Sequence, residues 1–175
     1  MEERSLRQYL KNKAAAMRRA AERKPKGEDW LETVEATCVA GDVTGVRRLR
    51  IRDWQFISDS GADFGGWGLG PSSPEILCGV LSTCLTHVYE IGAATLDIPL
   101  DRVEVRVAAQ NNDARFLAIE STDPALPSDI TAHVRLEAEG VPAESIERLH
   151  HYARERCPLT QLIKTPNDVR ILVET

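Results

Sequence analysis

Hydrophobic and polar residues follow different spacings along this chain, and the changes between them divide it into elements. Apolar residues recur every three or four positions in residues 4–23, which predicts an amphipathic helix. In residues 101–109 they alternate with charged residues, which predicts a strand with one buried face. Residues 73–94 are apolar on nearly every side and predict a central buried helix.

Weaker patterns assign the segments between these elements. Residues 61–73 contain five glycines and a proline, which predicts a loop that frames a site. Ser73 predicts the N-cap of the central helix, with Pro74 in its first turn. The other expected elements are strands at 33–39, 46–57, 115–120, 131–137 and 169–173, a turn at Gly41-Asp42, and a helix at 143–156 that ends before Pro158. This order of elements predicts an α+β fold, with strands packed around a long central helix.

Length and composition limit the classes of protein that fit. The 175 residues suffice for one domain, and 42% of them are hydrophobic against 28% charged, as in an ordinary globule. No apolar stretch approaches the roughly 18 residues of a membrane span, so we expect no membrane partner. The first residues, Met-Glu-Glu-Arg, lack the apolar core of a secretory signal, so a cytoplasmic location is expected.

Charge separates the N-terminus from the rest of the chain. Residues 1–27 hold nine basic and three acidic residues, a local charge of +6, so the other residues sum to −11 for a net charge of −5. We therefore divide the chain into a basic amphipathic helix with its linker (1–27) and a main domain (28–175). A basic helix could bind nucleic acid, but its apolar stripe favours docking on protein, and the acidic main domain would repel phosphates. No nucleic-acid partner is expected.

Two of the four cysteines stand in contexts that favour chemistry. Cys84 lies in the middle of the central helix, and Cys157 stands 73 positions later at the end of a second helix. Two such thiols could form a reactive couple in which one attacks and the other resolves, although core packing alone is the alternative. Cys38 and Cys78 are predicted to be small buried hydrophobic residues. No Cys-x-x-Cys or His-x-x-x-His spacing occurs, so no metal site is expected.

The residues around the first thiol resemble those of a known family. Asp59, the pair Gly65-Gly66, and Gly70-Pro71 fourteen and thirteen residues before Cys84 are similar to the glycine-rich loop and helix start of the OsmC/Ohr family. Cys157-Pro158 resembles the family's second cysteine motif, and residues 98–105 resemble the segment after its long helix. The resemblance covers about residues 30–175. It implies an OsmC-like fold, an intertwined homodimer with sites at the subunit interface, and no cofactor; the N-terminal helix is an addition.

The same resemblance implies an activity. Family peroxidases reduce organic hydroperoxides with a cysteine thiolate, which here would be Cys84, with Cys157 as the resolving thiol and an external dithiol as reductant. A cation must stabilise the thiolate, because an ordinary cysteine is only a few per cent ionised at neutral pH. Arg52 and Glu75 match the family's arginine and glutamate best, while Arg47 and Arg48 remain candidates. The alternatives are a solvated basic strand face and, for the whole chain, a non-catalytic protein that binds a small ligand.

Overall fold

The computed structural model describes residues 5–23, 30–41, 43–124 and 127–173. The chain forms two compact units, which we describe separately. Unit 1 comprises residues 1–24, 81–107 and 131–175, and unit 2 comprises residues 25–80 and 108–130. The helix α2 (Ser73–Leu96) and the strands β4 (Arg102–Gln110) and β5 (Ser128–Glu137) contribute residues to both units. The mixture of helices and strands confirms the predicted α+β class.

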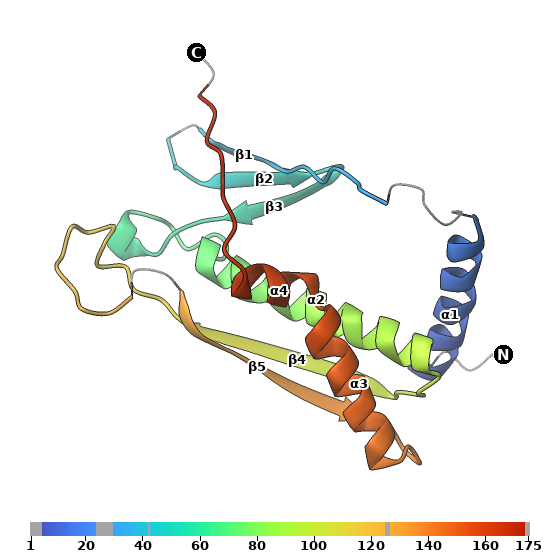
Figure 1. Ribbon diagram of the computed structural model, residues 1–175. Helices are drawn as coiled ribbons and strands as arrows, with labels where there is room; N and C mark the ends of the chain where they lie inside the picture. The colour runs from blue at the N-terminus through green and yellow to red at the C-terminus, as the bar shows by residue number, and fades with distance from the viewer. Residues whose placement is uncertain (1–4, 24–29, 42, 125–126, 174–175) are drawn as a thin grey trace. The chain divides into compact units, whose positions relative to one another are not determined.

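Unit 1 is built on the C-terminal part of α2. Its other helices are α1 (Leu6–Arg23), α3 (Ala143–Arg156) and α4 (Pro158–Lys164), and β4 pairs with β5 (Figure 1). The Asp101 N–H donates to the Glu137 carbonyl at 2.7 Å, which joins the start of β4 to the end of β5 and makes the pair antiparallel. The core of this unit contains the side chains of Leu85, Val88, Leu100, Leu149 and Ala153, all buried.

Helix α3 packs closely against α2 because of one glycine and one polar pair. A Cβ atom added at Gly92 would lie 2.7 Å from Cδ1 of Tyr152 and 2.8 Å from Cδ1 of Leu149, so only glycine permits this approach. One turn earlier, the hydroxyl of the buried Tyr89 lies 2.8 Å from Nδ1 of His150, and the two rings meet edge to face. These contacts fix the spacing of the two helices and therefore of the residues that they carry.

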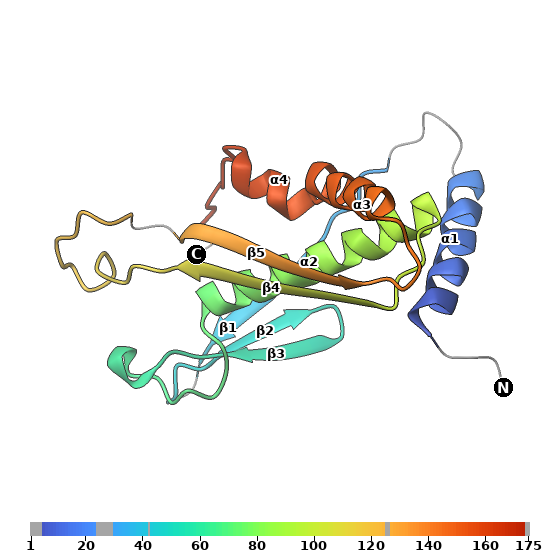
Figure 2. The ribbon, with the colours of Figure 1, turned by 90° about the horizontal axis from the view of Figure 1, so that it is seen from below.

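The N-terminal helix α1 docks on unit 1 at the C-terminal end of α2 (Figure 2). Leu10 is buried, and the Arg7 guanidinium donates to both carboxylate oxygens of Asp101, at 2.6 and 2.7 Å. A second ion pair joins Lys13 to Glu90 at 3.3 Å. The apolar stripe of this helix thus contacts protein, as its sequence pattern favoured.

Unit 2 contains a three-stranded antiparallel sheet in the order β1-β2-β3. The strands are β1 (Thr37–Ala40), β2 (Arg47–Ile51) and β3 (Trp54–Ser58), with Leu49 opposite both Cys38 and Phe56. Apolar side chains on both faces are exposed in the single chain, including Trp54, Phe56 and Ile57. The sheet needs a further layer to cover these side chains.

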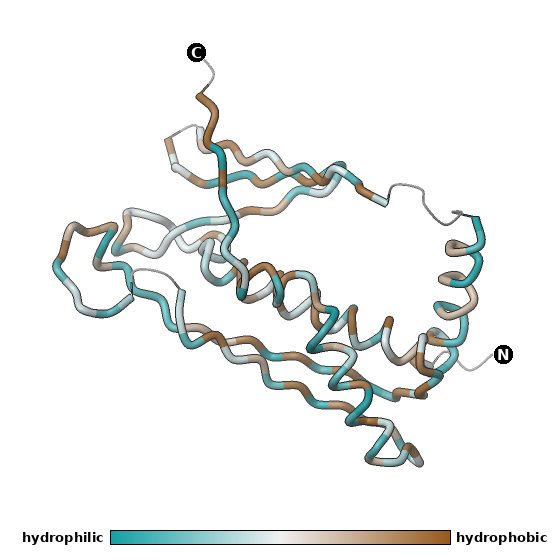
Figure 3. The backbone as a smooth tube through the Cα atoms, in the orientation of Figure 1, coloured by the Kyte–Doolittle hydropathy of each residue, from teal (hydrophilic) through white to brown (hydrophobic). Residues whose placement is uncertain are grey.

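Several predicted elements differ from the structure. Residues 115–120 form turns, because the Asp113 carbonyl accepts from the N–H groups of Phe116 and Leu117, and the predicted strand is wrong. Residues 169–173, whose end is hydrophobic (Figure 3), have no paired strand in the described chain. Ser72 rather than Ser73 precedes the first turn of α2, which runs two residues past Ala94. Helix α4 was not predicted, and the first strand covers only residues 37–40. Two predictions lie outside the described residues: Asp42 of the expected turn, and the linker after the N-terminal helix.

Helix α2 is the segment of the described chain that bears on the expectation about membrane spans. By length and composition alone it is long and apolar enough to cross a bilayer, with a mean hydropathy of 1.4 over its best window. A single helix of this kind is weak evidence for a membrane segment, because the core helix of a globular protein passes the same test.

Candidate functional site

The two predicted reactive thiols lie together in unit 1. The thiol of Cys157 donates toward Sγ of Cys84 over a sulfur–sulfur distance of 3.7 Å, and both cysteines are free. Cys157 is 0% exposed, whereas Cys84 is half-buried. The contact joins the middle of α2 to the end of α3, across the helix pair that Gly92 brings into close packing.

Cys157 stands where one helix ends and the next begins. Its N–H donates to the Ala153 carbonyl at 3.1 Å and closes α3, while its own carbonyl accepts from the Gln161 N–H at 3.0 Å and opens α4. Pro158, which lacks an N–H, occupies the first turn of α4, where no helical partner is needed. The proline therefore ends one helix, as predicted, and also starts another, and the thiol is held at the corner between them.

Burial and hydrogen bonding act in opposite directions on the Cys84 thiol. Burial raises the pKa of Cys84, because an apolar environment disfavours the thiolate. The backbone N–H of Leu159, in the first turn of α4, lowers that pKa by donating to the sulfur, while the neighbouring Cys157 raises it further. The net direction is upward, so the surroundings of Cys84 within unit 1 favour the neutral thiol.

Glu75 belongs to unit 2 and caps α2. One of its carboxylate oxygens accepts from the N–H and from the hydroxyl of Ser72, each at 2.7 Å, and these bonds lower the pKa of Glu75. This is the glutamate half of a capping box, in which a glutamate three residues into the helix satisfies the N–H of the capping residue. The hydrogen bonds give Glu75 a structural role, and the catalytic role assigned to it stays a prediction.

Arg52 also belongs to unit 2, at the turn between β2 and β3. Its backbone has a positive φ of 52°, its carbonyl accepts from Nε of Arg50, and its side chain is exposed. Among the described residues of unit 2, Arg52 and Glu75 form no ion pair with each other. The structure thus joins the two predicted cysteines, while Arg52 stays a prediction as the activating cation.

Asp59 organises the glycine-rich loop that follows β3. The buried carboxylate accepts from the N–H groups of Ser60, Trp67 and Leu69 at 2.8–3.1 Å, and these bonds lower the pKa of Asp59. A Cβ atom at Gly66 would lie 2.0 Å from the Ser60 carbonyl oxygen, so the loop requires glycine there. In the sequence this aspartate stood out only as part of the family resemblance. The available signal for its role was its position directly before a glycine-rich loop that has few side chains to stabilise it.

Arg47, the other arginine near this loop, is half-buried. Its guanidinium donates to the hydroxyls of Ser58 and Ser60 at 3.2–3.3 Å, and its charge lowers the pKa of Asp59.

The two remaining cysteines differ from expectation: Cys38 is exposed in the single chain rather than buried, and Cys78 is half-buried. Over the described residues, no group of three or more His, Cys, Asp or Glu side chains is placed to hold a metal ion.

The fold and the site define a class: an α+β protein with a long central helix and two adjacent thiols. The OsmC-like protein family matches residues 65–171, more than half of the chain. The chain therefore belongs to the OsmC-like family.

Solved structures show the same fold at low identity. The chain is similar to an OsmC-like protein from Mycoplasma pneumoniae, with a TM-score of 0.62, 14% identity and coverage of 76% of this chain and 88% of that one. An organic hydroperoxide resistance protein from Legionella pneumophila has a TM-score of 0.56 and 16% identity, with coverage of 78% of this chain and 92% of that one. A second such protein, from Elizabethkingia anophelis, has a TM-score of 0.52 and 18% identity, with coverage of 78% of this chain and 91% of that one. A search among curated proteins finds no match.

Proposed function

We propose that this protein is a thiol-dependent peroxidase that reduces organic hydroperoxides. The observation that carries the proposal is the 3.7 Å approach of the Cys84 and Cys157 sulfur atoms, since the resolving step of such a reaction requires the second thiol within reach of the first. Family membership supports it, and so do the hydroperoxide resistance proteins that share the fold.

The proposed reaction has three steps. The Cys84 thiolate attacks the outer oxygen of R–O–O–H, which forms Cys84–S–OH and releases RO⁻, protonated to the alcohol. The Cys157 thiol then attacks the sulfenic sulfur, a disulfide forms and water leaves. An external dithiol finally exchanges with the disulfide, restores both thiols and is itself oxidised.

The exposure of the two thiols supports this order. Cys157 has no accessible surface, so a peroxide cannot reach it, whereas Cys84 is half-buried. Attack by Cys157 on an oxidised Cys84 needs only a small movement of the sulfur atoms, because they already lie in contact. Cys84 is therefore the proposed peroxidatic cysteine and Cys157 the resolving one.

Activation of Cys84 requires a positive group from outside its immediate surroundings. Burial and Cys157 raise the pKa of Cys84, which opposes the thiolate that the first step needs. Arg52 is the proposed activating cation, with Glu75 as its orienting carboxylate, and Arg47 and Arg48 are the other candidates.

We also propose that two chains form a homodimer that shares the sites. The sheet β1-β2-β3 exposes Trp54, Phe56 and Ile57, at 64%, 51% and 50% of their surfaces. Such side chains on both faces of a sheet are unfavourable in water, and a second copy would bury them. Light scattering should report a dimer at micromolar concentration, and a monomer would count against this part of the proposal.

The decisive experiment measures turnover of cumene hydroperoxide with a dithiol reductant. Wild type should consume peroxide and Cys84→Ser should not, whereas Cys157→Ser, tested without the reductant, should consume one equivalent of peroxide and stop at the sulfenic acid. Arg52→Ala should slow both turnover and alkylation of Cys84 by iodoacetamide at pH 6, with Arg47→Ala and Arg48→Ala as comparisons.

The alternative function is non-catalytic binding of a small ligand. If Cys84 alkylates no faster than Cys78 and no arginine variant changes the rate, then Cys84 is an ordinary thiol. The peroxidase proposal then fails and the binding function takes its place.

A further inference from the structure

A crevice of about 330 Å³ lies within unit 1, bordered by α2, β5, α3 and α4. Its floor is apolar and includes Leu85, Tyr89, Val134 and Ala153, of which all but Val134 are buried. This volume is at the lower end of the range for small-molecule sites, about 300–1,000 Å³. The crevice therefore has the size and the lining to hold the apolar part of a small ligand.

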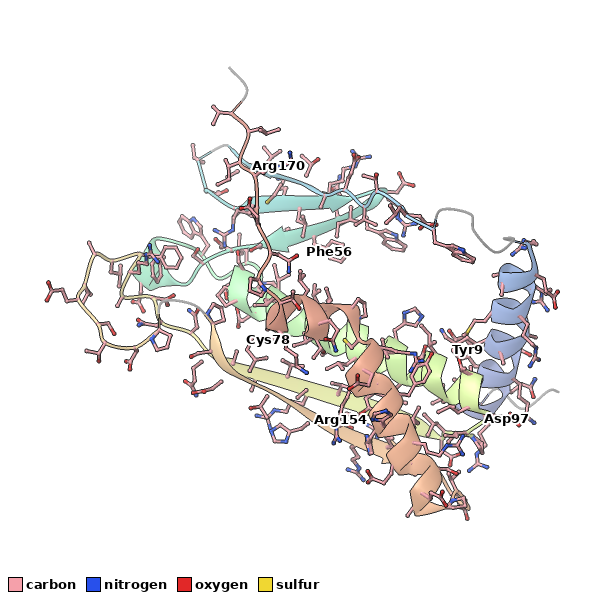
Figure 4. The ribbon with its side chains drawn as sticks, in the orientation of Figure 1. Tyr9, Phe56, Cys78, Asp97, Arg154 and Arg170 are labelled. Atoms are coloured by element: carbon pink, nitrogen blue, oxygen red, sulfur yellow. The ribbon has the colours of Figure 1, made fainter. Side chains whose placement is uncertain are left out.

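Two basic residues stand at this crevice, Arg154 from α3 and Lys164 from α4. Arg154 is labelled in Figure 4. Both are exposed, and neither forms an ion pair within the described part of the chain. Burial raises the pKa of Tyr89 in the floor; the positive charge of Arg154 lowers that pKa and the negative charge of Glu147 raises it, so the charge of Arg154 acts inside the crevice against that of Glu147. Two unpaired cations beside an apolar floor form a site for an anion with an apolar body.

The sign of the charge separates this crevice from two others in unit 1. A larger one, between α2 and α3, shares Arg154 with this crevice and also contains Glu144 and Glu147. Another, beneath α1, contains Asp97. No acidic residue lines the crevice of Arg154 and Lys164. In a chain with a net charge of −5, a crevice with basic residues alone is a departure from the average surface.

We infer that this crevice binds a small carboxylate with an apolar tail. The carboxylate would lie between Arg154 and Lys164, and the tail would cover Leu85 and Tyr89. The site flanks the segment of Cys157, whose N–H donates to the lining residue Ala153. Recognition by charge and apolar contact uses neither thiol, so this inference is independent of the proposed peroxidase activity.

Isothermal titration calorimetry with octanoate tests the inference on the Cys84→Ser protein, in which the proposed peroxidatic thiol is absent. We expect a dissociation constant of roughly 0.1–1 mM for octanoate. Octanol and octylammonium have the same tail with a neutral or a positive head, and each should bind at least about fivefold more weakly. Equal affinity for the three ligands, or no binding of octanoate, would overturn the inference.

Charge variants locate the ligand. Arg154→Gln and Lys164→Gln should each weaken octanoate binding about three- to tenfold. Arg148→Gln is the matched control for the larger crevice, because it removes the same charge from the same helix; Arg154 lines both crevices, so Lys164→Gln is the variant that tells them apart. Arg148→Gln should leave the affinity within about twofold, and an equal loss in all three variants would refute the site.

A filling variant tests the apolar part. Ala132 on β5 also lines the crevice and is exposed, so Ala132→Leu should occupy the space of the tail while both cations stay. We expect binding to fall at least about tenfold, with the urea midpoint unchanged as evidence of folding. Retained binding in a folded Ala132→Leu protein would refute the inference.

Discussion

Oxidation should join Cys84 to Cys157 and stabilise the protein strongly. The two sulfur atoms lie 3.7 Å apart, and a disulfide brings them to about 2.05 Å, so they must move together by about 1.7 Å. Side-chain rotation and a small shift of the α3–α4 corner can supply this movement. One equivalent of cumene hydroperoxide supplies the oxidation, and the number of free thiols should then fall by two.

The magnitude follows from the length of the closed loop. The cysteines stand 73 positions apart, so the loss of chain entropy in the unfolded state corresponds to about 4.4 kcal/mol at 25 °C. Because closing a disulfide commonly delivers less than this value, we expect the free energy of unfolding to rise by about 2–4 kcal/mol. With a urea dependence of about 1–3 kcal/mol/M, the midpoint should rise by at least about 0.7 M.

Urea unfolding followed by circular dichroism measures this rise, with oxidised and dithiothreitol-treated protein at one concentration. Cys157→Ser keeps Cys84 and its burial but cannot form the bond, so its midpoint should not respond to peroxide. Complete loss of two thiols with a midpoint change below about 0.5 M would contradict the reasoning. It would mean that the bond forms with different partners or that it strains the native state by as much as it constrains the unfolded one.

Three further predictions concern packing and charge. Gly92→Ala should lower the free energy of unfolding by about 1–3 kcal/mol in urea titrations, because the new Cβ would meet Tyr152. Gly79→Ala is the control in the same helix: its Cβ would point into open space, so the free energy of unfolding should rise by up to about 1 kcal/mol. Tyr89→Phe should cost about 1–3 kcal/mol in the same assay, since Nδ1 of His150 loses its hydrogen bond. Arg7, together with the N–H of Glu139, lowers the pKa of Asp101 to about 2, so this carboxylate stabilises the fold fully above about pH 4 and ceases to do so as the pH falls toward 2. The urea midpoint of wild type should therefore fall more steeply between pH 5 and 2 than that of Arg7→Gln.

Sequence reasoning succeeded where a pattern was long and regular. The alternation over residues 101–109 and the apolar run from Ser73 each predicted an element that the structure contains within two residues of the expected ends. The same reasoning selected Cys84 and Cys157 from four cysteines, by their positions in a helix and at a helix end. It could not give their separation, because that depends on how closely α3 approaches α2, and Gly92 decides this approach.

It failed where local hydrogen bonds compete with an apolar pattern. Residues 115–120 contain four consecutive apolar residues, which predicted a strand, yet Asn112 and Asp113 precede them and accept N–H groups from the residues that follow. Such side-chain and turn bonds offer the backbone an alternative to a strand. Residues 169–173 fail for another reason: a strand exists only with a partner, and their high β-propensity says nothing about which chain or edge would supply it.

The reactivity of Cys84 depends both on the groups beside it in unit 1 and on residues distant in the sequence. The groups that act on Cys84 within unit 1 come from α2 and from the corner between α3 and α4. Burial and Cys157 outweigh the single N–H of Leu159, so the pKa of the thiol is raised. A peroxidatic cysteine needs a lowered pKa, so the stabilising charge must come from a segment remote in sequence. Composition alone does not distinguish among the several arginines on and after β2. The midpoint of the pH–rate profile for alkylation of Cys84 therefore distinguishes the two cases. If the midpoint lies below about pH 8.5 and rises when one arginine is replaced, that arginine is the activating cation. If it lies above about pH 9 and no arginine variant changes it, only burial, Cys157 and the Leu159 N–H act on Cys84, and the thiol is too weakly ionised for peroxide reduction.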